Sequence, residues 1–264
     1  MQIDFDGATL YYETHGQGPD LVLLHPFPAN HKFWLPIVDA LASRYRLVLP
    51  DLRGHGQSQP GSGAATMQQH ARDVFRICDE LHIHRAAFLG CSIGGYVSFE
   101  LWRQARERVK AFVFIDTKAT VDSQEARANR LKSAEDVLLR GPESFVDGLV
   151  PKLIGRTTRT NRPDIAAAAR AMMLESSAAG MAAVMRGMAD RPDSVPALAT
   201  INVPTLVIFG DEDDLPISEG EAIRKSIRNA EMRVVEKAGH YAPFEKPEEV
   251  SRILRDWLGN LPRT

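Results

Sequence analysis

A serine flanked by glycines is the first feature of the sequence that could carry chemistry. The run Gly90-Cys91-Ser92-Ile93-Gly94 has the G-x-S-x-G pattern, in which the serine attacks an acyl carbon. By itself the pattern is weak, because it arises by chance in about one chain in ten of this length. Here it follows the apolar run 86–89 and precedes a helical pattern, which is the strand–turn–helix setting that the motif requires. We therefore predict that Ser92 is a nucleophile.

A nucleophilic serine needs a base, because a neutral hydroxyl attacks an acyl carbon too weakly near pH 7. His240 follows the last predicted strand, and α/β sheets place their sites at the carboxyl ends of strands. His55 precedes Ser92 in the chain and is the rival, with stabilisation of its own loop by hydrogen bonds as its alternative role. We predict His240 as the base.

The base in turn needs a carboxylate, and four of them, at positions 211–214, follow the strand that ends at Phe209. They cannot all be buried, because unpaired charges out of water are too costly, so one turns inward and the others stay solvated. The resulting order of Ser92, acid and His240 along the chain is the order of α/β-hydrolases and differs from that of the two best-known protease families.

The elements that must position these residues alternate between apolar strand patterns and helical patterns, which favours a mostly parallel sheet with helices on both faces. Asp6-Gly7 predicts a hairpin between the first two strands, and Thr66 with Gln69 predicts a capping box. The predicted strands are 2–6, 9–14, 20–25, 46–50, 86–90, 112–115, 204–209 and 232–236, and the predicted helices are 34–44, 66–81, 94–106, 218–228 and 247–258.

The alternation stops at about residue 118 and resumes near residue 204. Between these points no strand pattern stands out, and the stretch 166–188 is rich in alanine and methionine at loosely helical spacings. We therefore predict a core domain formed by residues 1–118 and 197–264, interrupted by a helical cap of residues 119–196.

Composition excludes several classes of protein. The chain of 264 residues carries 32 basic and 34 acidic side chains, and this balance shows no electrostatic footprint for nucleic acid or an anionic membrane. Its two cysteines, Cys78 and Cys91, are too few for a disulfide framework or a cysteine-ligated zinc site. Without a signal-peptide pattern or a long apolar run, we expect a soluble, cytoplasmic protein. We expect no metal and no cofactor.

Together these motifs resemble the α/β-hydrolase fold superfamily, in its serine-hydrolase branch, over nearly the whole chain. The segments that carry the resemblance are His25-Pro26-Phe27-Pro28 with Trp34, the run 51–58 (DLRGHGQS), the Ser92 turn, Gly210-Asp211-Glu212-Asp213 and Gly239-His240. The loop and the turn are most similar to those of small bacterial esterases and 3-oxoadipate enol-lactonase-like proteins. The family's usual His-Gly becomes His25-Pro26 here.

The resemblance implies the remaining site residues. The acid of the family's Gly-x-x-Asp pattern corresponds to Asp213, with Asp214 as the alternative. The backbone N–H groups of Phe27 and Ile93 correspond to the oxyanion hole. A serine nucleophile excludes the branches that use aspartate, namely haloalkane dehalogenases and epoxide hydrolases. Cofactor-free haloperoxidases commonly carry methionine where this chain has Ile93, which favours hydrolysis over perhydrolysis.

We therefore predict a hydrolase of small, largely apolar carboxylic esters or lactones. Its substrate would contact Phe27, Trp34, Phe145, Met181 and Met185, although ordinary helix packing is the alternative role of the methionines. The other functions that remain open are a C–C bond hydrolase, a thioesterase, a perhydrolase and a ligand receptor with little turnover. The partner is a small molecule, and the protein could be a monomer or a homo-oligomer.

Overall fold

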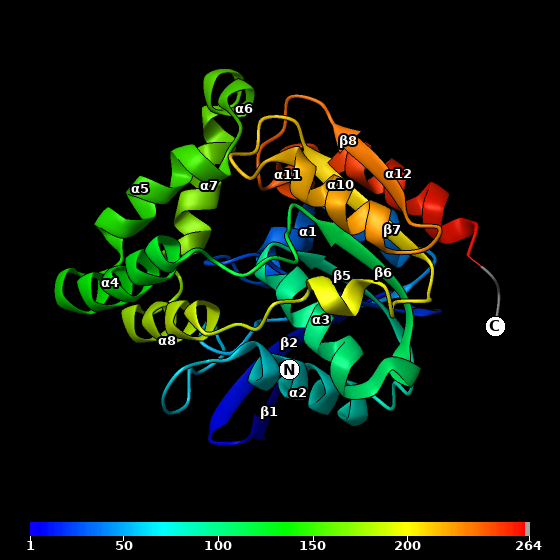
Figure 1. Cartoon of the computed structure of the whole chain (residues 1–264), viewed down its shortest axis with the longest axis horizontal. Helices are drawn as coiled ribbons and strands as arrows, with labels where there is room; N and C mark the ends of the chain where they lie inside the picture. The colour runs from blue at the N-terminus through cyan, green and yellow to red at the C-terminus, as the bar shows by residue number, and fades with distance from the viewer. Residues whose placement is uncertain (262–264) are drawn as a thin grey trace.

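An eight-stranded β-sheet runs through the computed structural model, which describes residues 1–261 (Figure 1). The strands are β1 (Gln2–Phe5), β2 (Ala8–His15), β3 (Asp20–Leu24), β4 (Arg46–Pro50), β5 (Ala86–Cys91), β6 (Val109–Ile115), β7 (Thr205–Gly210) and β8 (Glu231–Val235). Their order across the sheet is β1-β2-β4-β3-β5-β6-β7-β8. Only β1 with β2 and β2 with β4 pair antiparallel, and the other neighbours pair parallel. The predicted fold class is thereby confirmed.

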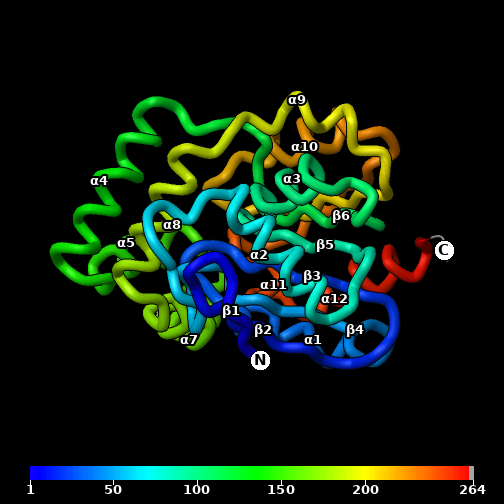
Figure 2. The backbone as a smooth tube through the Cα atoms, turned by 90° about the horizontal axis from the view of Figure 1, so that it is seen from below, coloured from blue at the N-terminus to red at the C-terminus, as the bar shows by residue number. Residues whose placement is uncertain are grey.

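Helices cover both faces of this sheet. They are the 3-10 turns η1 (His31–Trp34) and η2 (Arg106–Arg108) and the helices α1 (Leu35–Ala42), α2 (Met67–Glu80), α3 (Ile93–Ala105), α10 (Ile217–Ser226), α11 (Ala242–Glu245) and α12 (Pro247–Gly259). Figure 2 shows α3 and α10 on one side of the sheet and α1 with α12 on the other. The central strands β5 and β7 are therefore buried along their whole length, as an apolar strand covered on both faces must be.

Local sequence signals account for several of these elements. Asp6 and Gly7 have φ angles of 46° and 73°, which the two-residue turn between β1 and β2 requires. Thr66 begins α2, because its hydroxyl accepts the backbone N–H of Gln69 at 3.2 Å. The predicted hairpin is thus confirmed. Of the predicted capping box, the half made by the Thr66 hydroxyl is present, whereas the side-chain amide of Gln69 donates to Asp73 instead.

Strand β6 differs from its prediction, because it begins at Val109 rather than residue 112. Lys110 interrupts the apolar pattern there and concealed the early part of the strand. The strand nevertheless continues through Lys110, and β5 and β6 shift register between Ala86 and Ala87 to accommodate it.

Six helices lie between β6 and β7, in a segment that is described throughout. They are α4 (Gln124–Arg140), α5 (Glu143–Leu153), α6 (Arg156–Asn161), α7 (Pro163–Met173), α8 (Ala178–Ala189) and α9 (Val195–Leu198), here called the inserted helices. Figures 1 and 2 show α4, α5, α7 and α8 together at one side of the sheet. The Ala/Met-rich stretch forms two helices because Ser177 caps α8, its hydroxyl accepting the N–H of Gly180 at 3.0 Å.

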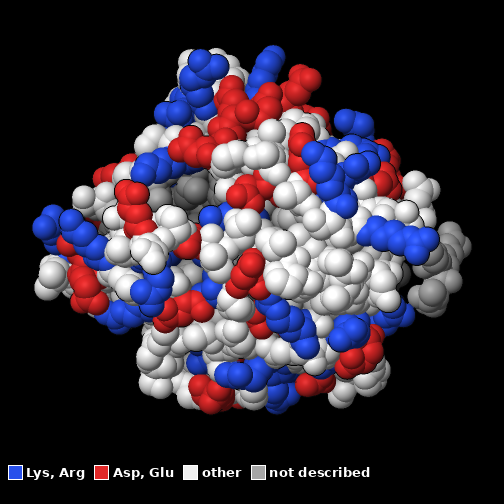
Figure 3. Space-filling view, viewed as in Figure 1, with Lys and Arg blue, Asp and Glu red and all other residues white. Residues whose placement is uncertain are grey.

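The surface of the molecule carries both positive and negative side chains. Figure 3 shows lysine and arginine side chains interspersed with aspartate and glutamate over the face viewed. Among residues 1–261, no helix combines the length and the apolar character needed to span a bilayer.

Candidate active site

Ser92 forms a sharp turn between a strand and a helix. Strand β5 ends at Cys91 and α3 begins at Ile93, so Ser92 makes the turn alone, with φ 54° and ψ −114°. A positive φ is strained for any residue with a side chain and persists only where the surroundings enforce it. Thr117 helps to do so, because its hydroxyl donates to the Ser92 carbonyl oxygen at 2.7 Å.

Two glycines make room for this turn. A Cβ atom at Gly90 would lie 2.3 Å from the carbonyl oxygen of Gly94, and one at Gly94 would lie 2.2 Å from that of Leu24. Both distances are far below a van der Waals contact, and the clashing atoms belong to the backbone. The glycines on either side of Ser92 are therefore required by the packing of β5 and α3.

His240 and Asp213 form a hydrogen-bonded pair. His240 follows β8 and Asp213 follows β7, and the two loops bring His240 Nδ1 within 2.7 Å of Asp213 Oδ2. A carboxylate accepts this bond, so Nδ1 carries the proton and Nε2 is left as the basic nitrogen. Asp213 Oδ1 accepts the N–H of Leu215 at 2.9 Å, which fixes the carboxylate. The side chain of Asp213 is 2% exposed, whereas Asp214 lies at the surface.

The Ser92 turn lies against the His240 loop. The thiol of Cys91 is 3.6 Å from the carbonyl oxygen of His240, which is within reach of a weak S–H donor. Burial raises the pKa of this thiol well above its usual range, so it stays neutral and serves as a small buried contact. Since β5, β7 and β8 run parallel, their carboxyl ends bring the three residues predicted for the triad to one edge of the sheet.

The loop after β3 carries the first of the two predicted oxyanion donors. Within residues 1–261, the backbone N–H groups of Phe27 and Ile93 have no protein acceptor. The carbonyl oxygen of Phe27 accepts the hydroxyl of Tyr241 at 3.4 Å, which ties this loop to the residue after His240.

His25 orients the same loop. Its Nε2 accepts the N–H of Leu52 at 2.9 Å, so the proton sits on Nδ1 and is donated to the carbonyl oxygen of Pro26 at 2.9 Å. Both bonds require a neutral imidazole. Burial lowers the pKa of His25 to about 4, which keeps the ring neutral at physiological pH.

His55, the rival base in the sequence, is buried away from the carboxylate of Asp213. Its ring meets that of His25 edge-on at 4.8 Å and that of Phe27 at 5.6 Å, and its Nδ1 lies 3.2 Å from the carbonyl oxygen of Leu52. Burial and the neighbouring rings of His25 and His70 lower the pKa of His55 well below its usual range. His55 therefore packs beneath the loop that carries Phe27.

The residues predicted to contact substrate lie at different depths. Phe145 of α5 is half-buried, and its ring centroid is 6.1 Å from that of Phe27, so this part of the inserted helices reaches the candidate oxyanion loop. Trp34 is fully buried against Phe33. Met181 and Met185 on α8 are at most 2% exposed.

The inserted helices are fastened to the loops of the candidate triad. Glu245 of α11 accepts the N–H of Gly239 and that of Gly155, each at 3.0 Å. Glu212 accepts the N–H of Thr157 at 2.6 Å, and the N–H of Tyr241 donates to the carbonyl oxygen of Leu153 at 3.2 Å. Figure 1 shows the α5–α6 end of the insert beside the loop that leads into α11.

Gly155 and Gly239 touch through their backbones at this attachment. A Cβ atom at Gly155 would lie 2.7 Å from the nitrogen of Gly239, and one at Gly239 would lie 2.4 Å from the nitrogen of Gly155. The loop of the candidate base and the insert are therefore packed together here without room for a side chain.

Sequence reasoning missed Asp116, Tyr241 and Glu245. Asp116 had a usable signal, since a polar residue directly follows the apolar run of β6. Tyr241 directly follows His240, but no motif in the sequence indicates its contact with Phe27. Glu245 had no such signal, because its contact with the inserted helices joins residues ninety positions apart in the chain.

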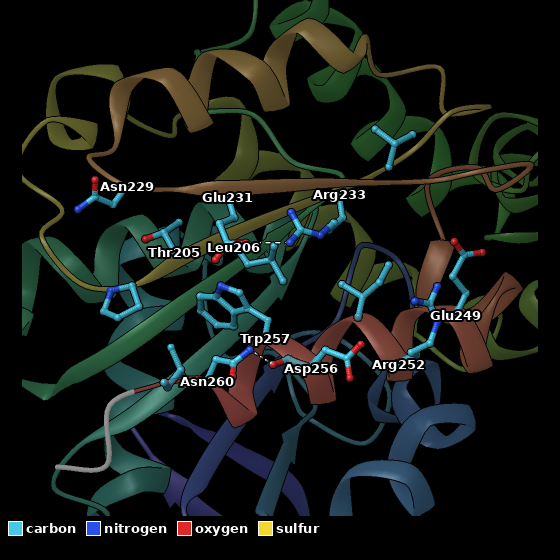
Figure 4. A pocket seen from close by; sticks show the side chains of 14 residues that line it. Thr205, Leu206, Asn229, Glu231, Arg233, Glu249, Arg252, Asp256, Trp257 and Asn260 are labelled. Atoms are coloured by element: carbon cyan, nitrogen blue, oxygen red, sulfur yellow. Dashed lines mark hydrogen bonds and ion pairs between the residues drawn. The ribbon is translucent and has the colours of Figure 1, made fainter.

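The surface is hollowed at places away from Ser92. One, of about 410 Å³, opens between β8 and α12, and Figure 4 shows Arg233, Glu249 and Trp257 around it. A second, of about 610 Å³, lies at the opposite ends of the strands, where Leu21 and Ala87 sit near the starts of β3 and β5. Within residues 1–261, no group of three or more His, Cys, Asp or Glu side chains is arranged to hold a metal ion.

The chain matches a known protein family over most of its length. Residues 19–247 match the family described as alpha/beta hydrolase fold. The chain is 28% identical over 258 residues to 3-oxoadipate enol-lactonase 1 of Acinetobacter baylyi, with 97% of this chain and 95% of the relative covered.

Solved structures show the same likeness. A thermophilic esterase from Thermogutta terrifontis, with malate bound, has a TM-score of 0.94 and 36% identity, covering 96% of this chain and 94% of its own. The enol-lactonase from Burkholderia xenovorans has a TM-score of 0.92 and 26% identity, covering 98% of this chain and 100% of its own. Both the family and these names support a hydrolytic activity.

Proposed function

Because the chain belongs to the α/β hydrolase fold family, we propose that it is a serine hydrolase that cleaves small, largely apolar carboxylic esters or lactones. The observation that carries the proposal is the 2.7 Å bond between His240 Nδ1 and Asp213 Oδ2 beside the strained turn at Ser92. Similarity to an esterase and to enol-lactonases supports the substrate class.

In this mechanism the Ser92 hydroxyl attacks the acyl carbon while His240 Nε2 takes its proton. Asp213 holds the imidazole in the required tautomer and stabilises the imidazolium that forms. The N–H groups of Phe27 and Ile93 donate to the oxyanion, and removing one such donor costs about 10²–10³ in rate. His240 then returns the proton to the leaving alcohol, and water hydrolyses the acyl-enzyme with the same histidine as base.

The inserted helices act as a cap in this proposal. The contact of Phe145 with Phe27, and that of the Gly155 backbone with the Gly239 backbone, support a cover over the edge of the sheet that carries Ser92. An apolar cover excludes water and strengthens the electrostatic interactions within the site. We assign this role to residues 119–196, with Trp34, Met181 and Met185 lining or supporting the acyl pocket.

Labelling with a serine-directed phosphonate tests the nucleophile. The wild-type protein should gain one adduct on the peptide that contains Ser92, and Ser92→Ala should gain none and lose hydrolysis of p-nitrophenyl acetate. A label on another peptide, or full activity in Ser92→Ala, would contradict the proposal. Turnover that stops after a single burst in the wild type would instead indicate a ligand receptor.

A panel of straight-chain esters and lactone rings then defines the substrate. The measured quantity is kcat/KM for each compound. Thioesters and a ketone that is cleaved at a carbon–carbon bond are included to test for a thioesterase and a C–C bond hydrolase. We expect hydrolysis of esters or lactones to exceed the other reactions.

A further inference from the structure

Asp116 is a fully buried carboxyl group that directly follows β6. Its side chain is 0% exposed, and its backbone has a positive φ of 44°, which is strained for aspartate. One oxygen, Oδ1, accepts the N–H of Gly210 at 2.8 Å, and the residue's own N–H donates to the carbonyl oxygen of Ile208 at 3.0 Å. The second oxygen, Oδ2, is buried and has no donor within residues 1–261.

The groups that face Asp116 are acidic or neutral. Asp213, Glu245 of α11 and Cys91 of β5 are its titratable neighbours, and the charge of Asp213 acts on Asp116 more strongly than that of Glu245. His240 is engaged with Asp213 rather than with Asp116. Burial, and next the negative charge of Asp213, raise the pKa of Asp116 well above its usual range. Within residues 1–261, no arginine or lysine forms a hydrogen bond or ion pair with Asp116.

We propose that Asp116 is a positioning residue that keeps a proton on Oδ2 and donates it in a hydrogen bond to the carboxylate of Asp213. Two adjacent buried carboxyl groups cannot both be ionised, and a hydrogen bond between them requires one proton. Asp213 can accept this bond, since its oxygens so far receive one donor each, from Leu215 and from His240. The inference rests on the proposed function, in which Asp213 is the acid of the triad.

In this arrangement Asp116 and Asp213 form a pair of carboxyl groups that together carry one negative charge. A hydrogen bond from Asp116 holds the carboxylate of Asp213 and lowers its basicity. The imidazolium of His240 that forms during catalysis then faces a fixed but less basic partner, so the proton passes readily from His240 to the leaving alcohol.

Infrared difference spectroscopy tests the protonation state directly. The spectrum of the wild-type protein minus that of Asp116→Asn is recorded at about pH 8, where an exposed carboxyl is ionised. We expect the carbonyl stretch of one protonated carboxyl in the wild type. Its absence, with the bands of an ionised carboxylate in its place, would overturn the proposal. The measurement needs no substrate, so it stands even if the protein fails to hydrolyse esters.

Kinetics of matched variants test the positioning role. Asparagine can accept the N–H of Gly210 and donate to Asp213 as the protonated acid does, so Asp116→Asn should keep kcat within about threefold. Asp116→Leu has no donor and should lower kcat by about tenfold, the scale of a lost hydrogen bond to a charged group. Its acidic limb of kcat/KM should move to higher pH, because Asp213 becomes more basic.

The opposite pattern would refute this role. If Asp116→Asn loses as much activity as Asp116→Leu, an ionised Asp116 contributes its charge and the proposal is wrong. If Asp116→Leu changes only the melting temperature and leaves the pH profile in place, Asp116 is structural and the positioning role is likewise wrong. Should Asp116→Leu fail to fold, the infrared comparison still decides.

Discussion

We expect acid to destabilise this protein, because several of its histidines are buried in the folded state with neutral side chains. Burial lowers the pKa of His70 to about 3 and that of His25 to about 4, from an ordinary value of 6.5. The rings of His70 and His55 lie next to each other, with centroids 6.3 Å apart, and both nitrogens of His70 lack a partner within residues 1–261. In the unfolded chain these imidazoles are exposed and take up a proton near pH 6.5.

The sign and size of the effect follow from proton binding. Between pH 6.5 and the lowered pKa, the unfolded state binds a proton that the folded state does not, so the free energy of unfolding falls as the pH falls. At about pH 5, each such histidine favours unfolding by RT ln(1 + 10^1.5), or about 2 kcal/mol. His25 and His70 together then remove about 4 kcal/mol, a large part of the roughly 5–15 kcal/mol that stabilises a typical domain. The loss levels off near the folded-state values of about 4 for His25 and about 3 for His70.

Urea unfolding at a series of pH values, from about 7.5 to about 5, measures this slope. The variant His70→Leu removes one buried imidazole at similar volume, so it should be at least as stable as the wild type at neutral pH and should lose about 2 kcal/mol less on acidification. His84→Leu is the matched control, because His84 is exposed, and its pH dependence should follow the wild type. Parallel slopes for wild type and His70→Leu would refute the reasoning.

Three further predictions concern the site and the cap. Asp213→Asn should fold but lower kcat by up to about 10⁴-fold, because the amide favours the wrong histidine tautomer. Asp214→Asn should change kcat little, because Asp214 is exposed. The reverse ranking in steady-state kinetics would assign the acid to Asp214. Glu245→Gln leaves one of two buried N–H groups without an acceptor, so thermal unfolding should show that the free energy of unfolding falls by about 1–3 kcal/mol. We also expect kcat to fall by the same factor for every acyl length. An unchanged kcat would mean that Glu245 is only a structural contact. Replacing Met181 or Met185 with phenylalanine should change the acyl-length profile of kcat/KM more than the rate with acetate esters, and profiles that stay parallel would mean that these methionines only pack the inserted helices.

The sequence by itself determined the elements whose causes are local. The turn at Asp6-Gly7, the cap at Thr66 and the apolar strands each depend on residues within a few positions of one another, and the structure has them at or near the predicted positions, with the early start of β6 as the exception. The strand–turn–helix setting of Ser92 is local in the same sense, because the glycines that it needs are its immediate neighbours. The eight-stranded, mostly parallel sheet could be predicted because the alternation of strands and helices leaves few other arrangements.

Only the tertiary structure decided which side chains meet. Four consecutive carboxylates follow β7, and their sequence does not say which one turns inward; the loop geometry brings Asp213 to His240 and leaves Asp214 at the surface. The contact of Asp116 with Gly210 at the end of β7, and that of Glu245 with Gly155 between two of the inserted helices, each join segments about ninety residues apart. Such contacts depend on the strand order and on the paths of the loops at the carboxyl ends of the strands. Hydrophobic periodicity indicates only which face of an element is buried, so it does not predict these contacts.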